Sequence, residues 1–364
     1  MEDLKQQWTR YLPPDRLEVF ESTRILKRLL EAKSALSRLD GYLVAIPNQA
    51  ILITTLGLHE AKDSSEIENI VTTMDELFRL VIEKEIFDPA TKEVRDYSLA
   101  LMTGFSRVQK NGVLRFNDLL EIQSVIKGDR EGIRNRPGTV IANQGSGTIV
   151  HVPPQDRETI VSLLENLLEY MNDDLLLDVD PLIKMAIFHS QFEAIHPFYD
   201  GNGRTGRILN VLYLVLKRQL RFPALYLSRY IIQHKSEYYR LLKDVGNNIN
   251  WEQWILFILD AVLHTSQTTL LMVEQIREQM QRNKLQIREI LGKKYSVELL
   301  NHLYKNPYTT VLLLSNDLSI NDKTSRSYLE KLCKHGVLER ITKQNRHYYL
   351  NKPLLKLLRD YPEQ

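Results

Sequence analysis

The sequence predicts a mainly α-helical protein that carries one β-hairpin and ends in a small winged-helix-like module. Three observations predict this class. Apolar residues recur at helical spacing along most of the chain, as in Leu163–Leu168. One internal stretch, residues 138–154, replaces that period with two β-branched runs around a glycine-rich turn. Beyond residue 294 the helical period restarts in short units that end in alternating, strand-like residues.

Length and composition indicate a folded, soluble protein. The 364 residues suggest two or three domains. With 43% hydrophobic and 26% charged residues, 15 Gly and 13 Pro, the composition excludes disordered and collagen-like chains. The longest apolar runs, such as Val211–Leu216, are far shorter than a membrane span of about 18 residues, and the N-terminus is not of secretory type. We therefore expect a cytoplasmic protein that does not contact membranes.

The single cysteine and the charge balance narrow the function further. Cys333 alone excludes an intrachain disulfide and a Cys-rich zinc site, and its apolar helical surroundings predict a structural thiol. The net charge is +2. Residues 295–364 hold 11 Lys/Arg and 7 Asp/Glu, which leaves 37 against 39 upstream (48 − 11 and 46 − 7). We therefore do not expect nucleic acid to cover the whole chain, but a small nucleic-acid module in the tail stays open.

We predict three regions: an N-terminal helical region over 1–95, a central region over 96–284, and a tail over 285–364. The last boundary rests on the polar, charged stretch Glu274–Lys294, which follows the apolar helical period of Trp251–Met280.

The hairpin is predicted over Gly138–Pro154, where two β-branched runs flank a turn rich in Gly, Asn and Ser. An isolated two-stranded hairpin leaves its edges unpaired, so it is suited to receive an extended peptide as an added strand. An ordinary connector is the alternative.

The tail predicts helices over Ser296–Lys305, Thr309–Leu314 and Lys323–His335, followed by a two-stranded ribbon around Lys343–Asn345. Three short helices and a ribbon are typical of a winged helix, whose third helix often enters the DNA major groove. Basic residues lie on both predicted elements: Lys323, Arg326, Lys331, Lys334, Arg340, Lys343 and Arg346. A solvated surface is the plain alternative, and winged helices also dimerise, so DNA and a second copy of the chain are both open partners.

The most informative segment is the polar, glycine-dense run His196–Arg207, between predicted helices over Ile183–Ile195 and Ile208–Leu216. Pro197 ends the first helix, and the glycines that follow let backbone amides converge at the start of the second. A helix N-terminus with unpaired N–H groups attracts anions, so the segment predicts a phosphate site.

Side chains of the same segment supply the remaining chemistry. Arg204 and Arg207 lie three residues apart, so both can grip phosphate oxygens from one helix face. Asp200 precedes the glycines and is suited to hold Mg²⁺ beside those phosphates. His196, at the loop entrance, can accept a proton from an attacking hydroxyl.

Other interpretations of these residues fail or stay weaker. The spacing Gly201-x-Gly203-x-x-Gly206 resembles a dinucleotide fingerprint, but no strand precedes it and no acid follows at about 20 residues. An EF-hand is excluded because its twelfth position would be Val211. His189 and His196 lie two helical turns apart, but no third ligand accompanies them, so we expect His189 to be buried or to support the site indirectly.

The segment His196–Arg207 resembles the signature of the Fic family, HPFx[DE]GNGRxxR, at every fixed position. The resemblance implies a helical Fic-type core, with ATP and Mg²⁺ as substrate and cofactor, and transfer of AMP to a Ser, Thr or Tyr hydroxyl of a protein. It implies His196 as the base, Asp200 as the metal ligand and Phe198 as an apolar anchor. It also implies contacts to ATP from Gly201, Asn202, Gly203, Arg204, Thr205, Gly206 and Arg207.

Ser64–Asn69 is similar to the inhibitory motif [ST]xxxE[GN] of that family. The resemblance implies that Glu68 pairs with Arg207 and stops ATP from taking its productive pose, with Ser64 and Asn69 completing the motif. Its position upstream of the signature resembles the class whose inhibitory helix is N-terminal and part of the same chain.

Two further features gain a role from the resemblance, which covers roughly residues 1–275. The hairpin would be the flap that holds the target, through Val150 and His151. Tyr239, in Ser236–Tyr239, would stack on the adenine, with core packing as the alternative.

Two functions follow from this reading. The first is an autoinhibited protein adenylyltransferase that acts on a protein substrate, with the chain itself included. The second is a DNA-binding regulator that uses the Fic-like body as a nucleotide sensor.

Overall fold

The computed structural model describes residues 11–14, 18–44, 49–83, 88–142, 147–246, 250–343 and 346–359. Up to residue 216 its elements are η1 (Glu18–Glu21), α1 (Thr23–Val44), α2 (Gln49–Ile67), α3 (Met74–Glu83), α4 (Pro89–Asn111), α5 (Phe116–Lys127), β1 (Ile141–Ala142), β2 (Ile149–His151), α6 (Arg157–Asn172), α7 (Pro181–Ile195) and α8 (Asn202–Leu216). Then follow α9 (Leu227–Gln233), α10 (Lys235–Gly246), α11 (Trp251–Leu291) and η2 (Gly292–Lys294). The predicted mainly helical class is confirmed.

Helix α7 lies at the centre of the core because it is apolar on all sides, a pattern that only a surrounded helix can bury. Asp180 caps its first turn by accepting from the Leu182 N–H at 2.9 Å, and Pro181 fits the position where no N–H is needed. Helix α8 packs against α7, α4 and α5. The two helices that carry the signature at their junction are therefore held by the core of the protein.

Helix α8 begins at Asn202, earlier than the predicted Ile208, so the second half of the signature is helical. The apolar period missed this turn because the buried side chains there are polar. Arg204 and Arg207 are 2% and 1% exposed, respectively.

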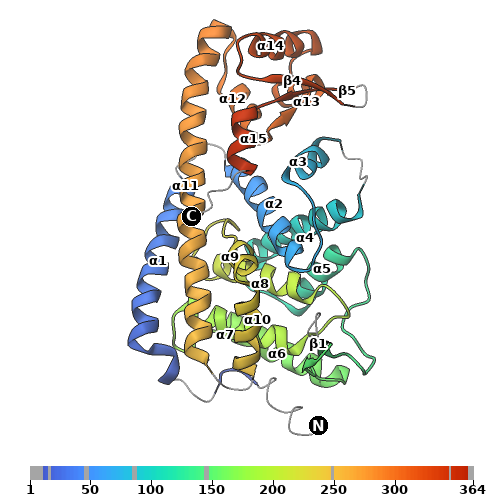
Figure 1. Ribbon diagram of the computed structural model, residues 1–364, viewed down its shortest axis with the longest axis vertical. Coiled ribbons are helices and arrows are strands. Elements are labelled where there is room, and N and C mark those ends of the chain that lie inside the picture. The colour runs from blue at the N-terminus through green and yellow to red at the C-terminus, as the bar shows by residue number, and fades with distance from the viewer. Residues whose placement is uncertain are drawn as a thin grey trace.

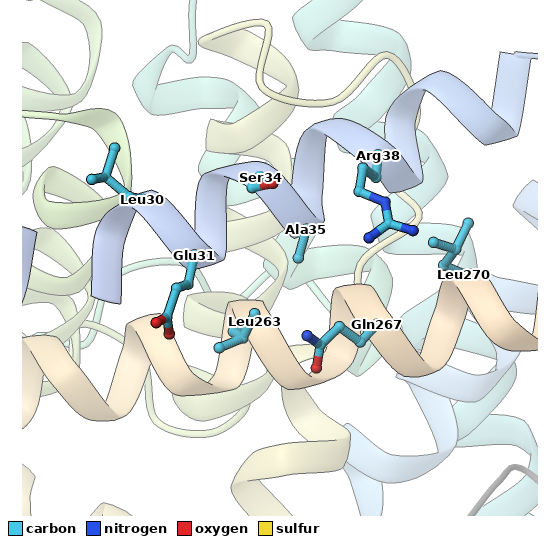
Figure 2. Close-up of a pocket in the computed structure, with 8 residues that line it drawn as sticks. All are labelled: Leu30, Glu31, Ser34, Ala35, Arg38, Leu263, Gln267 and Leu270. Atoms are coloured by element: carbon cyan, nitrogen blue, oxygen red, sulfur yellow. The ribbon is translucent and has the colours of Figure 1, made fainter. Parts of the chain in front are cut away.

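The 41-residue helix α11 runs along the molecule, and α1 packs against its first half (Figure 1). By length and composition, Trp251–Lys294 is the one span in the described residues apolar enough to cross a membrane, but 61% of its apolar window is buried inside the protein. It passes the predicted boundary at 284/285 as a continuous helix, and the division into three regions stays a prediction. A groove of about 420 Å³ lies between α1 and α11 (Figure 2), lined by Leu30, Glu31, Ser34, Ala35, Arg38, Leu263, Gln267 and Leu270.

The tail contains α12 (Val297–Lys305), β3 (Tyr308–Thr309), α13 (Val311–Leu318), α14 (Asp322–Lys334), β4 (Glu339–Lys343), β5 (Arg346–Leu350) and α15 (Lys352–Arg359). It packs at one end of α11 and against α2 and α3 (Figure 1). The strands form one sheet in the order β3-β5-β4, with all pairs antiparallel.

Two details of the tail differ from expectation. The predicted helix over Thr309–Leu314 starts later, at Val311, because Thr309 pairs with Tyr349 as part of β3. The ribbon therefore has a third strand, and helix α15 follows it without having been predicted. This helix has eight residues and buries Leu354 and Leu358, so its apolar period is too short to stand out in the sequence. Gln344 and Asn345 of the predicted turn lie outside the described residues.

The basic residues of α14 and the ribbon that the structure describes are exposed: Lys323, Arg326, Lys331, Lys334, Arg340 and Arg346. DNA binding and the winged-helix assignment stay predictions. Cys333 is half-buried on α14 and packs against the core, and burial raises the pKa of its thiol, as suits a structural residue.

Candidate active site

The signature loop is braced by its own residues. His196 ends α7 in the left-handed conformation (φ 47°), and Gly201 starts α8 in the same region (φ 81°). Asn202 donates from Nδ2 to the Phe198 carbonyl and accepts at Oδ1 from the Phe198 N–H, both at 2.8 Å. Phe198 itself is fully buried, as the apolar anchor was expected to be. Because both ends of the Asn202 amide are engaged within the loop, its side chain shapes the loop, and only its main-chain N–H points toward the helix N-terminus.

The start of α8 is an anion site that a carboxylate of the same chain occupies. The first N–H groups of a helix have no partner within it, and the dipole there favours negative charge. Glu68, in the turn after α2, brings Oε1 to 2.8 Å from Nη2 of Arg207. A Cβ on Gly203 would stand 2.5 Å from the same oxygen, so only glycine leaves room for the Glu68 carboxylate here.

Ser64 completes the hold on Arg207. Its hydroxyl accepts from Nε at 2.7 Å and its carbonyl accepts from Nη2 at 2.9 Å. Burial alone would lower the pKa of Arg207, but the charge and hydrogen bond of Glu68 together with Tyr238 and Tyr97 outweigh it, and the pKa is raised. Asn69, at φ 64°, closes the turn and accepts from Lys235 at 3.5 Å. Glu68 therefore pairs with Arg207 as the inhibitory motif predicts, Ser64 adds two contacts that the sequence analysis did not foresee, and the buried guanidinium stays charged.

The two arginines of the signature contact acids from different parts of the chain. Arg204 donates from Nη1 to Glu93 of α4 at 2.9 Å, and its Nη2 lies 3.6 Å from Oδ1 of Asp200. Arg207 points to α2 instead. The spacing of three residues did not predict these partners, because each arginine pairs with an acid that lies far away in the sequence and is brought near by the packing of another helix. Glu93 is a site residue that the sequence analysis missed.

Asp200 is engaged but accessible. Its side chain is 59% exposed, and Oδ2 accepts from Lys127 of α5 at 2.5 Å. Oδ1 accepts from the Gly201 N–H. Partial burial by itself would raise the pKa of Asp200, but Lys127 and the Gly201 N–H more than offset it and the pKa lies below its usual range. The described residues contain no group of three or more His, Cys, Asp or Glu that could hold a metal by themselves.

His196 is held as a neutral imidazole. Burial lowers its pKa to about 4, and the charge of Arg134 acts in the same direction. A proton acceptor must be neutral before it reacts, so His196 is in the right state at neutral pH.

The hairpin is present, and the three residues of its second strand differ in exposure. Strands β1 and β2 pair antiparallel, and residues 143–146 of the predicted turn lie outside the described residues. His151 is 4% exposed and its Nε2 lies 2.8 Å from the Ala194 carbonyl of α7, so it fastens the hairpin to the core. Val150 is half-buried, and Ile149 is 57% exposed. The side chain turned outward is thus Ile149, a position that the sequence analysis did not select.

Three further predicted residues surround this centre. The ring of Tyr239 is 45% exposed, while Tyr238 beside it is buried in the core. Burial, followed by the nearby charge of Glu68, raises the pKa of Tyr239 to about 12. Thr205 is fully buried, so its side chain faces the core. A Cβ on Gly206 would stand 2.5 Å from Oε1 of Glu193, so Gly206 serves close packing of α8 on α7.

His189 lies beneath the site rather than in it. It is fully buried on α7, and its Nε2 is 2.9 Å from the Tyr238 hydroxyl, with its ring stacked on Trp254. Burial lowers its pKa to about 3, with Arg207 acting in the same sense. This agrees with a supporting role.

The pKa of His189 predicts acid sensitivity. The unfolded histidine takes up a proton near pH 6.5, while the folded one does so only near pH 3. The contribution of the buried, neutral His189 to the free energy of unfolding is therefore complete above pH 6.5, and it is lost as the pH falls below that value. Lowering the pH from 7 to 5 should reduce the free energy of unfolding of both proteins. We expect this reduction to be about 2 kcal/mol smaller in His189→Gln than in the parental protein. Denaturant unfolding at both pH values measures this, and equal losses would contradict it.

Comparison with known proteins finds three family matches along the chain. Residues 26–106 match the Fic/DOC family N-terminal domain, and residues 113–214 match the Fic/DOC family domain itself. The chain belongs to the Fic/DOC family. Residues 279–354 match the C-terminal domain described as protein adenylyltransferase SoFic-like.

Curated relatives of this Fic/DOC chain are similar over part of their length. A protein adenylyltransferase fic-1 of Caenorhabditis elegans is 31% identical over 130 residues, which are 35% of this chain and 23% of that protein. A protein adenylyltransferase Fic of Aedes aegypti is 30% identical over 159 residues, or 43% and 30% of the two chains. The chain thus matches less than a third of the length of either relative.

Solved structures share the fold. A Fic family protein from Desulfovibrio desulfuricans G20 has a TM-score of 0.58 at 19% identity, covering 93% of this chain and 98% of that one. A structure of Fic-1 from C. elegans, residues 134–508 with E274G, has a TM-score of 0.53 at 21% identity over 68% and 72%. The match to the first structure includes the tail as well as the Fic core.

Proposed function

We propose that this chain transfers AMP from ATP to a hydroxyl of a protein, and that Glu68 holds it in a low-activity state. The observation that carries the proposal is the Glu68 carboxylate on Arg207 at the N-terminus of α8. The helix dipole of α8 and the Arg207 guanidinium both favour a phosphate at this position. The Glu68 carboxylate takes the place of that phosphate. The adenylyltransferase names of the relatives support the same reaction.

The reaction proposed is an in-line displacement at the α-phosphorus. His196 accepts the proton of the acceptor hydroxyl while that oxygen bonds to phosphorus and the bond to pyrophosphate breaks. The first amides of α8 and Arg207 hold the phosphates once Glu68 has moved away, and the exposed ring of Tyr239 stacks on the adenine. The acceptor is a Ser, Thr or Tyr side chain, presented beside the hairpin by strand addition.

Asp200 suits Mg²⁺ as a single protein ligand. Mg²⁺ is commonly held by one or two carboxylates together with substrate phosphates, and the half-exposed Asp200 next to the phosphate site fits that donor set. Bound there, the ion would neutralise charge on the leaving pyrophosphate. The Lys127 ammonium holds the same carboxylate, so it competes with the cation.

This competition predicts opposite shifts for two variants. Asp200→Ala should raise the Mg²⁺ concentration for half-maximal transfer and slow turnover, because the carboxylate ligand is gone. Lys127→Met should lower that concentration, because Asp200 is released from its cation. Titrating Mg²⁺ against transfer rate in both variants checks the assignment, and unchanged midpoints would argue against Asp200 as the ligand.

The function is tested by following two labels. Parental protein and Glu68→Gly are incubated with Mg²⁺ and either α-labelled or γ-labelled ATP, alone and with peptides that bear Ser, Thr or Tyr. We expect the α-label to stay on protein or peptide and the γ-label to leave as pyrophosphate. Retention of the γ-label would indicate phosphoryl transfer instead. Absence of both labels from the Glu68→Gly samples would contradict the proposed reaction.

A further inference from the structure

Arg134 is a buried arginine whose hydrogen bonds all go to carbonyls around the signature loop. It lies in the connection between α5 and β1 and is 0% exposed. Nε donates to the His196 carbonyl at 2.8 Å, and Nη2 donates to the Ile195 carbonyl at 3.3 Å. Nη2 also donates to the Pro154 carbonyl, just beyond β2, and the Arg134 N–H donates to the Pro197 carbonyl at 3.0 Å.

The Arg134 side chain therefore ties the signature loop to the segment that directly follows strand β2 of the hairpin. The neighbouring residues strengthen the tie, since the N–H groups of Asn135 and Arg136 donate to the Tyr199 hydroxyl at 3.0 and 3.1 Å. His196 sits in the left-handed region, a conformation that L side chains rarely adopt unless their surroundings hold it. The Arg134 bonds to the carbonyls of Ile195 and His196 supply such a hold.

No carboxylate in the described part of the chain forms an ion pair with Arg134, and the negative charge that acts on it is that of Asp156, which lies further away. Nη1 of Arg134 is buried without a hydrogen bond, and burial lowers the pKa of the guanidinium. A structural arginine would usually be paired, because an uncompensated buried charge is costly. The cation instead lies beside the imidazole that must stay neutral.

Resting on the proposed role of His196, we propose that Arg134 is a positioning residue that orients His196 and joins this histidine to the hairpin that receives the target. Other ionisable groups near His196 are His151 on β2, Glu193 on α7, and Glu68 and Arg207 beyond them. Arg134 is the one that also contacts the His196 main chain.

The test measures the titration of His196 directly and transfer separately. Histidine resonances are followed by NMR against pH in the Glu68→Gly protein and in the same protein with Arg134→Met or Arg134→Lys, with His196→Ala used to assign the signal. Arg157→Met is the matched control. Arg157 is an exposed arginine that donates to one main-chain carbonyl, that of Ile133 next to Arg134, at 3.3 Å.

In Arg134→Met we expect the His196 titration to move up by about half a pH unit or more and transfer at neutral pH to fall about tenfold. Arg134→Lys keeps the charge but not the reach to several carbonyls, so the titration should stay low while transfer still falls. Arg157→Met should change neither. A folded Arg134→Met protein with unchanged titration and transfer would overturn the proposal, and if it does not fold, unchanged transfer in Arg134→Lys would do so.

The NMR result stands apart from the proposed function. If the parental and Glu68→Gly proteins transfer no AMP while the titration still moves, the reaction is wrong and the link from Arg134 to His196 holds.

Discussion

His196→Ala should reduce AMP transfer by about 10² to 10⁴, the usual range for loss of a general base. The variant is best made in the Glu68→Gly background, where the rate before the substitution is high enough to measure a large fall. ATP affinity should change little, because the phosphates are expected to be held by Arg207 and the α8 amides and not by the imidazole. Quenched time courses with α-labelled ATP measure transfer, and equilibrium titration with ATP measures binding.

His335 provides the matched control for that experiment. It is an exposed histidine at the end of α14, in the tail, and contacts none of the site residues. His335→Ala should label protein at the parental rate. If His196→Ala does so as well, His196 is not the base. If it loses ATP binding together with transfer, the loop has collapsed and the base assignment loses its support.

Glu68→Gly should increase transfer by about tenfold or more. In the folded protein Arg207 is fully engaged by Glu68 and Ser64, so it cannot hold a γ-phosphate, and ATP would lie with its α-phosphate badly aligned for in-line attack. A sheltered ion pair can be worth a few kcal/mol, and 1.4 kcal/mol corresponds to a factor of ten in rate. Removing one carboxylate should therefore raise activity, which is an unusual direction for a substitution in an active site.

Two further variants separate inhibition from simple destabilisation. Glu66→Gly removes an acid two residues away that pairs with Lys62 at 2.7 Å and does not touch Arg207, so it should not raise transfer. Adding Arg207→Ala to Glu68→Gly should abolish the gain, because the released guanidinium is what aligns the nucleotide. Melting temperatures show whether each protein is folded. Equal or lower transfer by a well-folded Glu68→Gly protein would mean that Glu68 is structural.

Local sequence accounts for the junction of α7 and α8. Pro181 and Asp180 start α7, the apolar residues on all its sides place it in the core, and Gly201 permits the φ of 81° from which α8 begins. These are properties of single residues and of short-range spacing. For the same reason the hairpin and a phosphate site at His196–Arg207 could be predicted without a structure, whereas the signature and the inhibitory motif were identified by their resemblance to a known family.

Partners brought from distant parts of the chain could not be predicted in this way. Arg204 meets Glu93, which is 111 residues away, and Asp200 meets Lys127, which is 73 residues away. Nothing in the local pattern distinguishes these acids and bases from the many others on helix surfaces. The Glu68–Arg207 pair, 139 residues apart, was foreseen only because a family resemblance linked the two motifs.

The sequence by itself thus predicted the kind of chemistry that we propose: a glycine-rich helix start with arginines for phosphate, a carboxylate for a cation and a histidine for a proton. Those properties belong to residue types and to spacing within one or two helical turns. Only the tertiary structure decided which group each one faces, because packing brings α2, α4, α5 and the hairpin to one end of α7 and α8. That packing placed Glu68 on Arg207, turned Arg204 toward Glu93, and buried Arg134 beneath His196.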